Sequence, residues 1–273
     1  VLDDGVEFRS HIDGGKHLFT PEKVVEIQKN FGSDIMMPLD ECTPGGAPHA
    51  QAVRAEERTY RWAARARAHW AAVCDPEKQS LFGIVQGNVY HDLRRLSAER
   101  ITSLDFPGYA VGGLSVGESK DEMYPAIDVT TDLLPRDKPR YLMGVGDPLD
   151  LVEGVRRGID MFDCVLPTRS GRTGQAFTRF GPVNLRNARH ADDPRPLDAS
   201  VACSASRDYS RAYLHHLVRS GEILGAMLLT WHNIQYYQDL MAELRAAILA
   251  GRFEETAARI EAGWRSGEEE KAA

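Results

Sequence analysis

The chain has 273 residues, 42% of them hydrophobic, which is enough to bury one sizeable core and fits a single α/β barrel. Its formal net charge of −7 argues against a protein whose whole surface binds a polyanion, so a nucleic-acid site must be a local patch. The four cysteines lack the paired spacing of a disulfide scaffold, which indicates a reducing compartment. No apolar run reaches the length of a membrane span and no secretory leader opens the chain, so we expect a cytoplasmic protein with no membrane association.

The opening residues are typical of the middle of a fold and not of its beginning. The chain begins with Val1 rather than Met, and residues 3–8 have the pattern of a turn that enters a strand. We therefore expect the chain to be a piece of a longer protein.

Short apolar runs of strand length follow along the chain, at 35–39, 81–85, 109–114, 141–145 and 161–166. Helical patterns lie between them, at 21–30, 50–73, 91–104, 120–134 and 148–157. Alternating strands and helices predict a parallel sheet with right-handed crossovers. Polar groups at the strand ends favour a (β/α)8 barrel, with a doubly wound open sheet as the alternative.

The pattern changes after Gly171. Residues 175–179 and 182–186 flank Phe180-Gly181 and predict a hairpin. A loop is expected over 190–206 and helices over 209–220 and 231–250. The tail from Glu254 is helical by composition, and its charged end at 268–271 is expected to fray.

Carboxylates at two of the strand ends are candidates for chemistry. Asp163 lies in an otherwise apolar segment, where it is either a catalytic group or a helix-capping or ion-pairing device. Asp40 follows the first predicted strand, and Gln86 follows the second.

A planar purine-like base needs such acceptors and amides, together with exposed backbone and an apolar face. Gly112-Gly113-Leu114 offers the backbone and Met143 offers the face. The alternatives are tight turns for the glycines and ordinary core filling for Met143.

A basic segment follows Asp163. Between Arg169 and His190 there are five arginines, at 169, 172, 179, 186 and 189, and no acidic residue. This predicts a patch for phosphates and base edges, and a solvated basic face is the alternative.

Four blocks of the sequence, at 82–87, 109–118, 138–146 and 160–169, resemble the bacterial tRNA-guanine transglycosylases. The resemblance runs from the start of the chain to about Phe253. It implies a (β/α)8 TIM barrel with a small zinc subdomain, a homodimer, and exchange of guanine for preQ1 at the wobble position of tRNAs with a GUN anticodon. It divides the chain into a partial barrel (1–170), a hairpin with a degenerate zinc subdomain (171–235) and C-terminal helices (236–273).

The resemblance also implies roles for individual residues. Asp163 matches the nucleophile that attacks ribose C1′ and forms a covalent intermediate. The positions that match base-binding residues are Asp40, Gln86, Gly113, Leu114 and Met143. Cys42 and Glu118 match supporting residues, and Arg169 and Arg172 match residues near the anticodon nucleotides that flank the target.

The first departure from the family is the absence of its N-terminal Asp-Ser-Gly-Gly-Phe/Tyr-Gln motif, which holds a second catalytic Asp and a stacking aromatic. Asp13-Gly14-Gly15 is only superficially similar. We therefore expect a barrel that is incomplete at the N-terminus, and a chain that is inactive alone unless a longer parent supplies the missing part.

The second departure is the metal site, for which the family has Cys-x-Cys-x2-Cys and a distant His. The matching positions here are Val201, Cys203, Ser206 and His232. Two good ligands out of four predict zinc binding that is weak or lost. The alternatives are a residual site and simple packing of Cys203 and His232.

Two other functions were weighed. A non-catalytic RNA-binding relative, like the accessory subunit of the eukaryotic enzyme, is favoured by the missing motif and altered zinc ligands, whereas retention of Asp163, Asp40 and Gln86 favours an enzyme. An unrelated barrel glycosidase would place sugar-stacking Trp residues near strand ends, but Trp62, Trp70, Trp231 and Trp264 fall in predicted helices.

Overall fold

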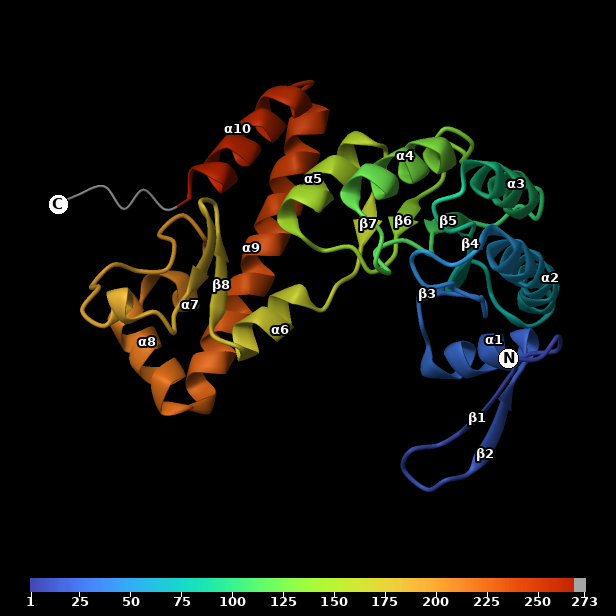
Figure 1. Cartoon of the computed structure of the whole chain (residues 1–273), viewed down its shortest axis with the longest axis horizontal. Helices are drawn as coiled ribbons and strands as arrows, with labels where there is room; N and C mark the ends of the chain where they lie inside the picture. Colours follow the sequence, from blue (N-terminus) through green and yellow to red (C-terminus); the bar gives the residue numbers. More distant parts are fainter. Residues whose placement is uncertain (268–273) are drawn as a thin grey trace. The chain divides into compact units, whose positions relative to one another are not determined.

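The structure, a computed structural model that describes residues 1–267, divides into two units. The barrel unit comprises residues 1–145 and 153–163, and the C-terminal unit comprises residues 146–152 and those from 164 onward. Most elements of both are labelled in Figure 1. The three-part division expected from the sequence stays a prediction, and its boundary at 235–236 would fall inside helix α9 (Ile223–Leu249).

A parallel sheet forms the centre of the barrel unit. Within the described residues it has five strands, in the order β3 (Ile35–Met36), β4 (Ser80–Val85), β5 (Gly108–Val111), β6 (Arg140–Leu142) and β7 (Met161–Phe162). Strand order therefore follows chain order, as in a barrel, whereas a doubly wound sheet reverses direction at a switch point. The predicted barrel-type fold is confirmed.

The helices that alternate with these strands also match the prediction to within a few residues. They are α1 (Pro21–Phe31), α2 (His49–Val73), α3 (His91–Thr102), α4 (Lys120–Thr131) and α5 (Pro148–Arg156). Local sequence sets their ends. Thr20 caps α1 by accepting from the Lys23 N–H at 3.2 Å, and Gly32 ends it in the left-handed conformation. A capping box of Ser119 and Glu122 starts α4.

Burial explains why the sequence of β4 is a continuous apolar run. All of its residues after Ser80 are buried, as expected for a strand covered on both faces. The apolar cluster around it includes Ile101 of α3, Tyr109 of β5 and Leu142 of β6. This packing fixes the strands whose ends carry the candidate site.

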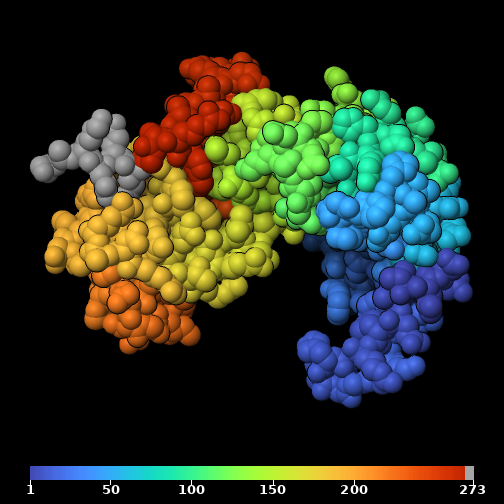
Figure 2. Space-filling model, in the orientation of Figure 1, coloured from blue at the N-terminus to red at the C-terminus, as the bar shows by residue number. Residues whose placement is uncertain are grey.

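An antiparallel hairpin of β1 (Val6–Arg9) and β2 (Lys16–Phe19) opens the barrel unit, where the sequence predicted only entry into a strand. Its surface, in dark blue, stands out from the helices of the same unit (Figure 2). The indole N–H of Trp62 in α2 donates to the Asp3 carbonyl at 2.8 Å and ties the opening residues to that helix.

The C-terminal unit is mainly helical. Its elements are α6 (Leu166–Arg172), β8 (Gln175–Thr178), β9 (Gly181–Asn184), the 3-10 turn η1 (Ala188–His190), α7 (Ser204–Arg207), α8 (Arg211–Ser220), α9 and α10 (Phe253–Ser266). The buried Asn233 side chain joins three of them. It accepts from the Phe177 N–H and donates to the carbonyls of Pro167 and Gln175, each at 2.9 Å.

Three predicted boundaries are wrong in this region. Residue 166 begins α6 instead of ending a strand, because Pro167 favours the first turn of a helix. The hairpin turns at Arg179-Phe180, one residue earlier than predicted. Helix α9 begins at Ile223, well before Trp231. The predicted frayed end at 268–271 lies outside the described residues. Among residues 1–267, no helix is long and apolar enough to cross a membrane.

Candidate functional site

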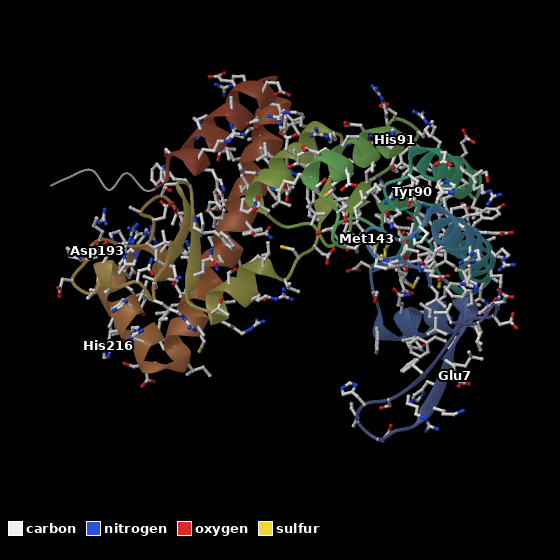
Figure 3. The ribbon with its side chains drawn as sticks, in the orientation of Figure 1. Glu7, Tyr90, His91, Met143, Asp193 and His216 are labelled. Carbon is white, nitrogen blue, oxygen red and sulfur yellow. The ribbon has the colours of Figure 1, made fainter. Side chains whose placement is uncertain are left out.

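The register of the sheet places four predicted site residues in one row. The last paired residues of four neighbouring strands are aligned across the sheet: Val85, Val111, Leu142 and Phe162. The next residues along the chain are Gln86, Gly112, Met143 and Asp163. The carboxyl ends of parallel strands are where α/β barrels build their active sites. Met143 is labelled in Figure 3.

Asp163 is an exposed carboxylate with one oxygen anchored. Its Oδ1 accepts from the Tyr141 hydroxyl at 2.6 Å and from the Gly144 N–H at 2.7 Å. Within residues 1–267 its Oδ2 has no hydrogen-bond partner. Burial raises the pKa of Tyr141, and the bond to the Asp163 carboxylate raises it further. The Tyr141 hydroxyl therefore keeps its hydrogen and donates it to Asp163. One oxygen is thus oriented while the other is available to react.

Asp40 and Gln86 form the second part of the site. The Gln86 amide Nε2 donates to Asp40 Oδ2 at 2.6 Å, and Gln86 is almost fully buried. Burial raises the pKa of Asp40, and the bond from Gln86 opposes that rise. The pair therefore presents a desolvated carboxyl beside an amide, a combination suited to the edge of a purine.

Gly113 is required by the position of Gln86. Its φ of +68° is left-handed, and a Cβ there would lie 2.2 Å from Gln86 Oε1. At Gly112, a Cβ would lie 2.9 Å from Gln86 Nε2 and 3.5 Å from Met143 Sδ. The two glycines therefore let the backbone pass beside the amide and the thioether. The role of their backbone in base binding stays a prediction.

The loop after Gly113 is held by Glu118. Its two carboxylate oxygens accept from the N–H groups of Ser115 and Val116, the second at 2.9 Å. Since a trans peptide points its N–H and C=O in opposite directions, the Leu114 carbonyl is directed away from Glu118. Burial raises the pKa of the Cys42 thiol, and the negative charge of Asp40 raises it further. The supporting roles of Cys42 and Glu118 stay predictions.

Arg94 is a buried residue of the site that the sequence analysis missed. Its guanidinium donates to the backbone carbonyls of Asn88 at 2.6 Å, Gly112 at 2.7 Å, Val85 at 3.2 Å and Gly113 at 3.3 Å. Burial lowers the pKa of Arg94 to about 10, which leaves it charged at neutral pH. It joins the loops after β4 and β5, the loops that carry Gln86 and Gly113.

Arg169 and Arg172 lie on α6 of the C-terminal unit, and both are exposed. Two other arginines of the predicted basic patch are already engaged. Arg179 pairs with Asp198 at 3.1 Å, and Arg189 Nε contacts His190 Nε2 at 3.2 Å. The nucleic-acid role of the patch stays a prediction, and the arginines of the patch whose side chains make no hydrogen bond or ion pair among residues 1–267 are Arg169, Arg172 and Arg186.

The four positions that match zinc ligands do not supply a zinc set. Val201 has no lone pair, and Ser206 offers a hydroxyl instead of a thiolate. Within residues 1–267 no group of three or more His, Cys, Asp or Glu side chains could hold a metal. The Ser206 Oγ lies 2.9 Å from Cys203 Sγ and 2.7 Å from His232 Nδ1, while His232 Nε2 lies 2.7 Å from the Phe177 carbonyl. Burial lowers the pKa of His232.

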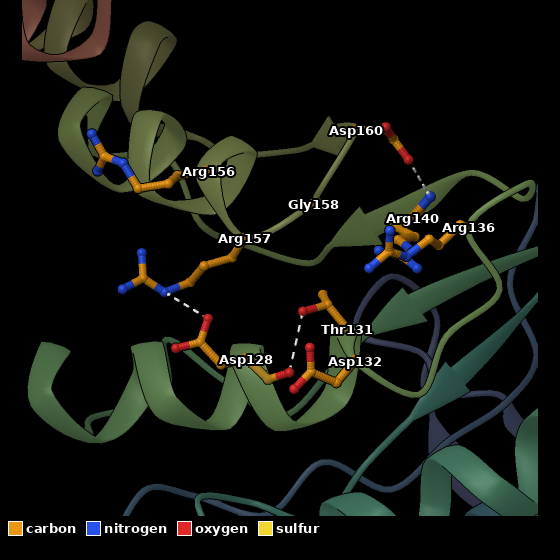
Figure 4. A pocket seen from close by; sticks show the side chains of 9 residues that line it. All are labelled: Asp128, Thr131, Asp132, Arg136, Arg140, Arg156, Arg157, Gly158 and Asp160. Carbon is orange, nitrogen blue, oxygen red and sulfur yellow. Dashed lines mark hydrogen bonds and ion pairs between the residues drawn. The ribbon is translucent and has the colours of Figure 1, made fainter. Parts of the chain in front are cut away.

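A polar cavity of about 620 Å³ in the barrel unit lies away from this row of residues (Figure 4). Arg140, which begins β6, and Asp160, which precedes β7, place it at the amino ends of the strands. Two of its arginines are engaged in ion pairs: Arg157 pairs with Asp128 at 3.1 Å, and both Arg156 and Arg157 bond to Glu153.

Comparison with known proteins identifies the family of the chain. The model of one family, queuine tRNA-ribosyltransferase, matches residues 1–266. The chain belongs to the queuine tRNA-ribosyltransferase family. The predicted resemblance is confirmed.

Curated relatives with the same name share more than half of their aligned residues with this chain. The protein of Dinoroseobacter shibae is 58% identical over 93% of this chain and 66% of its own length. That of Brucella melitensis biotype 1 is 55% identical over 97% of this chain and 70% of its own length. That of Zymomonas mobilis subsp. mobilis is 54% identical, over 93% and 66%. The chain thus spans about two thirds of the length of these relatives.

Proposed function

We propose that the protein exchanges guanine for preQ1 at the wobble position of tRNAs with a GUN anticodon, in queuosine biosynthesis. The observation that carries this proposal is the Asp163 carboxylate, with Oδ1 anchored by Tyr141 and Gly144 and Oδ2 without a partner among residues 1–267. Its place in one row with Gln86 and Met143 supports a base beside a reacting ribose.

The chemistry follows from a carboxylate nucleophile and a good leaving group. In the first step Asp163 Oδ2 bonds to ribose C1′ while the bond from C1′ to guanine breaks, and guanine leaves with the electron pair and takes a proton from water. In the second step a nitrogen of the incoming base gives its proton to water and bonds to C1′, while the ester to Asp163 breaks and restores the free carboxylate. One glycosidic bond replaces another, so no external energy source is required.

Recognition of the base is assigned to the residues around this carboxylate. Asp40 and Gln86 offer a carboxyl and an amide to the polar edge of the base. The backbone of Gly113 and Leu114 supplies further hydrogen-bonding groups, oriented by Glu118, and the Met143 side chain covers the apolar face. A target nucleotide in an anticodon loop can be splayed out at low cost, which suits a site of this kind.

The remaining partners are proposed on weaker structural support. Arg169 and Arg172 are exposed on α6 and suit the phosphates that flank the target nucleotide. The exposed apolar residues Ile223, Met227 and Trp231 recur along α9, and support a homodimer that sedimentation of the chain would test. The four cysteines are free, which is compatible with a cytoplasmic protein.

Exchange of radiolabelled guanine into a tRNA with a GUN anticodon tests the proposed activity. Because the family's N-terminal motif is absent here, the assay uses the chain joined to the N-terminal part of a relative that carries it. We expect this joined protein to incorporate label and its Asp163→Asn variant to incorporate none. If the joined protein retains tRNA on a filter but incorporates no label, the exchange proposal fails. The non-catalytic RNA-binding relative would then be the better description.

A further inference from the structure

The side chains at the positions of the family's metal site form a directed chain of hydrogen bonds. The Phe177 carbonyl can only accept, so His232 Nε2 at 2.7 Å carries a hydrogen. In the neutral ring Nδ1 is then the acceptor, and the Ser206 hydroxyl donates to it over 2.7 Å. The Ser206 oxygen in turn accepts from the Cys203 thiol at 2.9 Å. Each polar hydrogen of these three side chains has a partner.

This Cys203–Ser206–His232 relay is buried and connects separate elements. Ser206 and His232 are fully buried, and Cys203 is nearly so. Ser206 belongs to α7 and His232 to α9, and Phe177 belongs to β8. The relay therefore links a short helix, a long helix and a strand, which is the kind of cross-link that a structural metal makes in a small subdomain.

The fourth position is filled by an apolar side chain. Val201 is buried and lines the same cavity of the C-terminal unit as Tyr236 and Leu240 of α9. Tyr236 lies one helical turn beyond His232. A metal here would have to break the bond between Ser206 and His232 and deprotonate Cys203, and would gain two strong ligands where a structural zinc site uses four.

We propose that the Cys203–Ser206–His232 relay, with Val201 packed beside α9, replaces the structural zinc of the family and stabilises the C-terminal unit without metal. The difference from a metal-dependent subdomain then rests on two side chains, Val201 and Ser206. The double substitution Val201→Cys with Ser206→Cys would restore three thiols and one imidazole, a complete zinc set.

The experiment measures zinc content and thermal unfolding of the full chain, with and without a strong chelator. The wild-type chain, purified from zinc-supplemented cells, is expected to carry far less than one zinc per chain and to keep its Tm in chelator. The Val201→Cys/Ser206→Cys chain is expected to carry about one zinc per chain and to lose thermal stability in chelator. Binding of Co²⁺, followed by its thiolate absorption bands, gives a second readout of the restored site.

A single substitution tests the relay itself. Ser206→Ala leaves the Cys203 thiol and His232 Nδ1 buried without a partner, so it lowers the Tm; Ser220→Ala, at an exposed position that ends α8, leaves the Tm unchanged. A wild-type chain with one tightly bound zinc, whose removal lowers the Tm, would overturn the proposal. So would a Ser206→Ala chain as stable as Ser220→Ala, or a folded double variant that still excludes zinc.

Discussion

Gly113→Ala is the substitution whose effect on the base site can be worked out most closely from the structure. The backbone at Gly113 has φ +68°, and the added Cβ would lie 2.2 Å from Gln86 Oε1. The left-handed backbone alone costs an alanine about 1–2 kcal/mol. The contact is too short to persist, so the Gln86 amide must move away from Asp40, whose Oδ2 it bonds at 2.6 Å.

The loss of activity at the site comes in addition to the backbone strain. A hydrogen bond to a carboxylate is worth about 1.5–3 kcal/mol, so displacement of Gln86 should lower kcat/KM for guanine roughly 10- to 150-fold. Gly32→Ala is a matched control, since its φ is +72° and nothing lies within 4 Å of its added Cβ. It carries the same backbone strain without the contact to Gln86.

Steady-state incorporation of labelled guanine into tRNA, beside urea unfolding of each chain, separates the two effects. Both variants should lose a similar stability from backbone strain, while only Gly113→Ala loses kcat/KM by the stated factor. Equal exchange kinetics in the two variants would refute the idea that Gly113 is required for the placement of Gln86.

Three further substitutions address other parts of the account. Tyr141→Phe removes the 2.6 Å hydrogen bond to Asp163 and should lower kcat roughly tenfold or more, while the KM for guanine stays unchanged. An unaltered kcat in the exchange assay would contradict the role of Tyr141 in anchoring Asp163. Arg94→Met leaves buried carbonyls without donors, so urea unfolding should show a destabilisation of about 3 kcal/mol or more. Arg95→Met, at an exposed neighbouring position, is the control and should cost little. Equal losses of stability in the two variants would contradict the role given to Arg94. Because burial raises the folded-state pKa of Asp40 above 3.8, its contribution to stability is present below pH 3.8 and is lost as the pH rises through the folded pKa. The Tm of Asp40→Asn relative to wild type should therefore increase across that range, and a constant difference would contradict the shift.

Most of the barrel could be predicted from the sequence because its signals are local. Apolar runs of strand length located β3 to β7, with Asp40 and Gln86 directly after two of the runs and Asp163 within the last. The alternation of strands and helices then implied a parallel sheet, and parallel strands bring these ends together. All of these strands except β4 are shorter than predicted, since residues such as Gly112 lie beyond the last paired residue of their strand.

What the sequence did not reveal depends on contacts between distant residues. Arg94 is spaced with Ser97, Ala98 and Ile101 along the buried face of α3, and a cation in that stripe was the available signal. Tyr141 lies within a predicted strand, but its bond to Asp163 spans 22 positions of the chain. Ser206 likewise bonds to His232, 26 positions along the chain, so the sequence alone indicated only the loss of a zinc ligand at this position.

The central claim, that Asp163 is a nucleophile, is tested most directly by trapping the RNA adduct. End-labelled tRNA with a GUN anticodon is incubated with the chain joined to the N-terminal part of a relative, denatured and run on a denaturing gel. The account predicts a slower protein–RNA band with wild type that Asp163→Asn lacks and that added guanine diminishes. An adduct of equal intensity in Asp163→Asn, or rapid guanine exchange by wild type without any adduct, would contradict it.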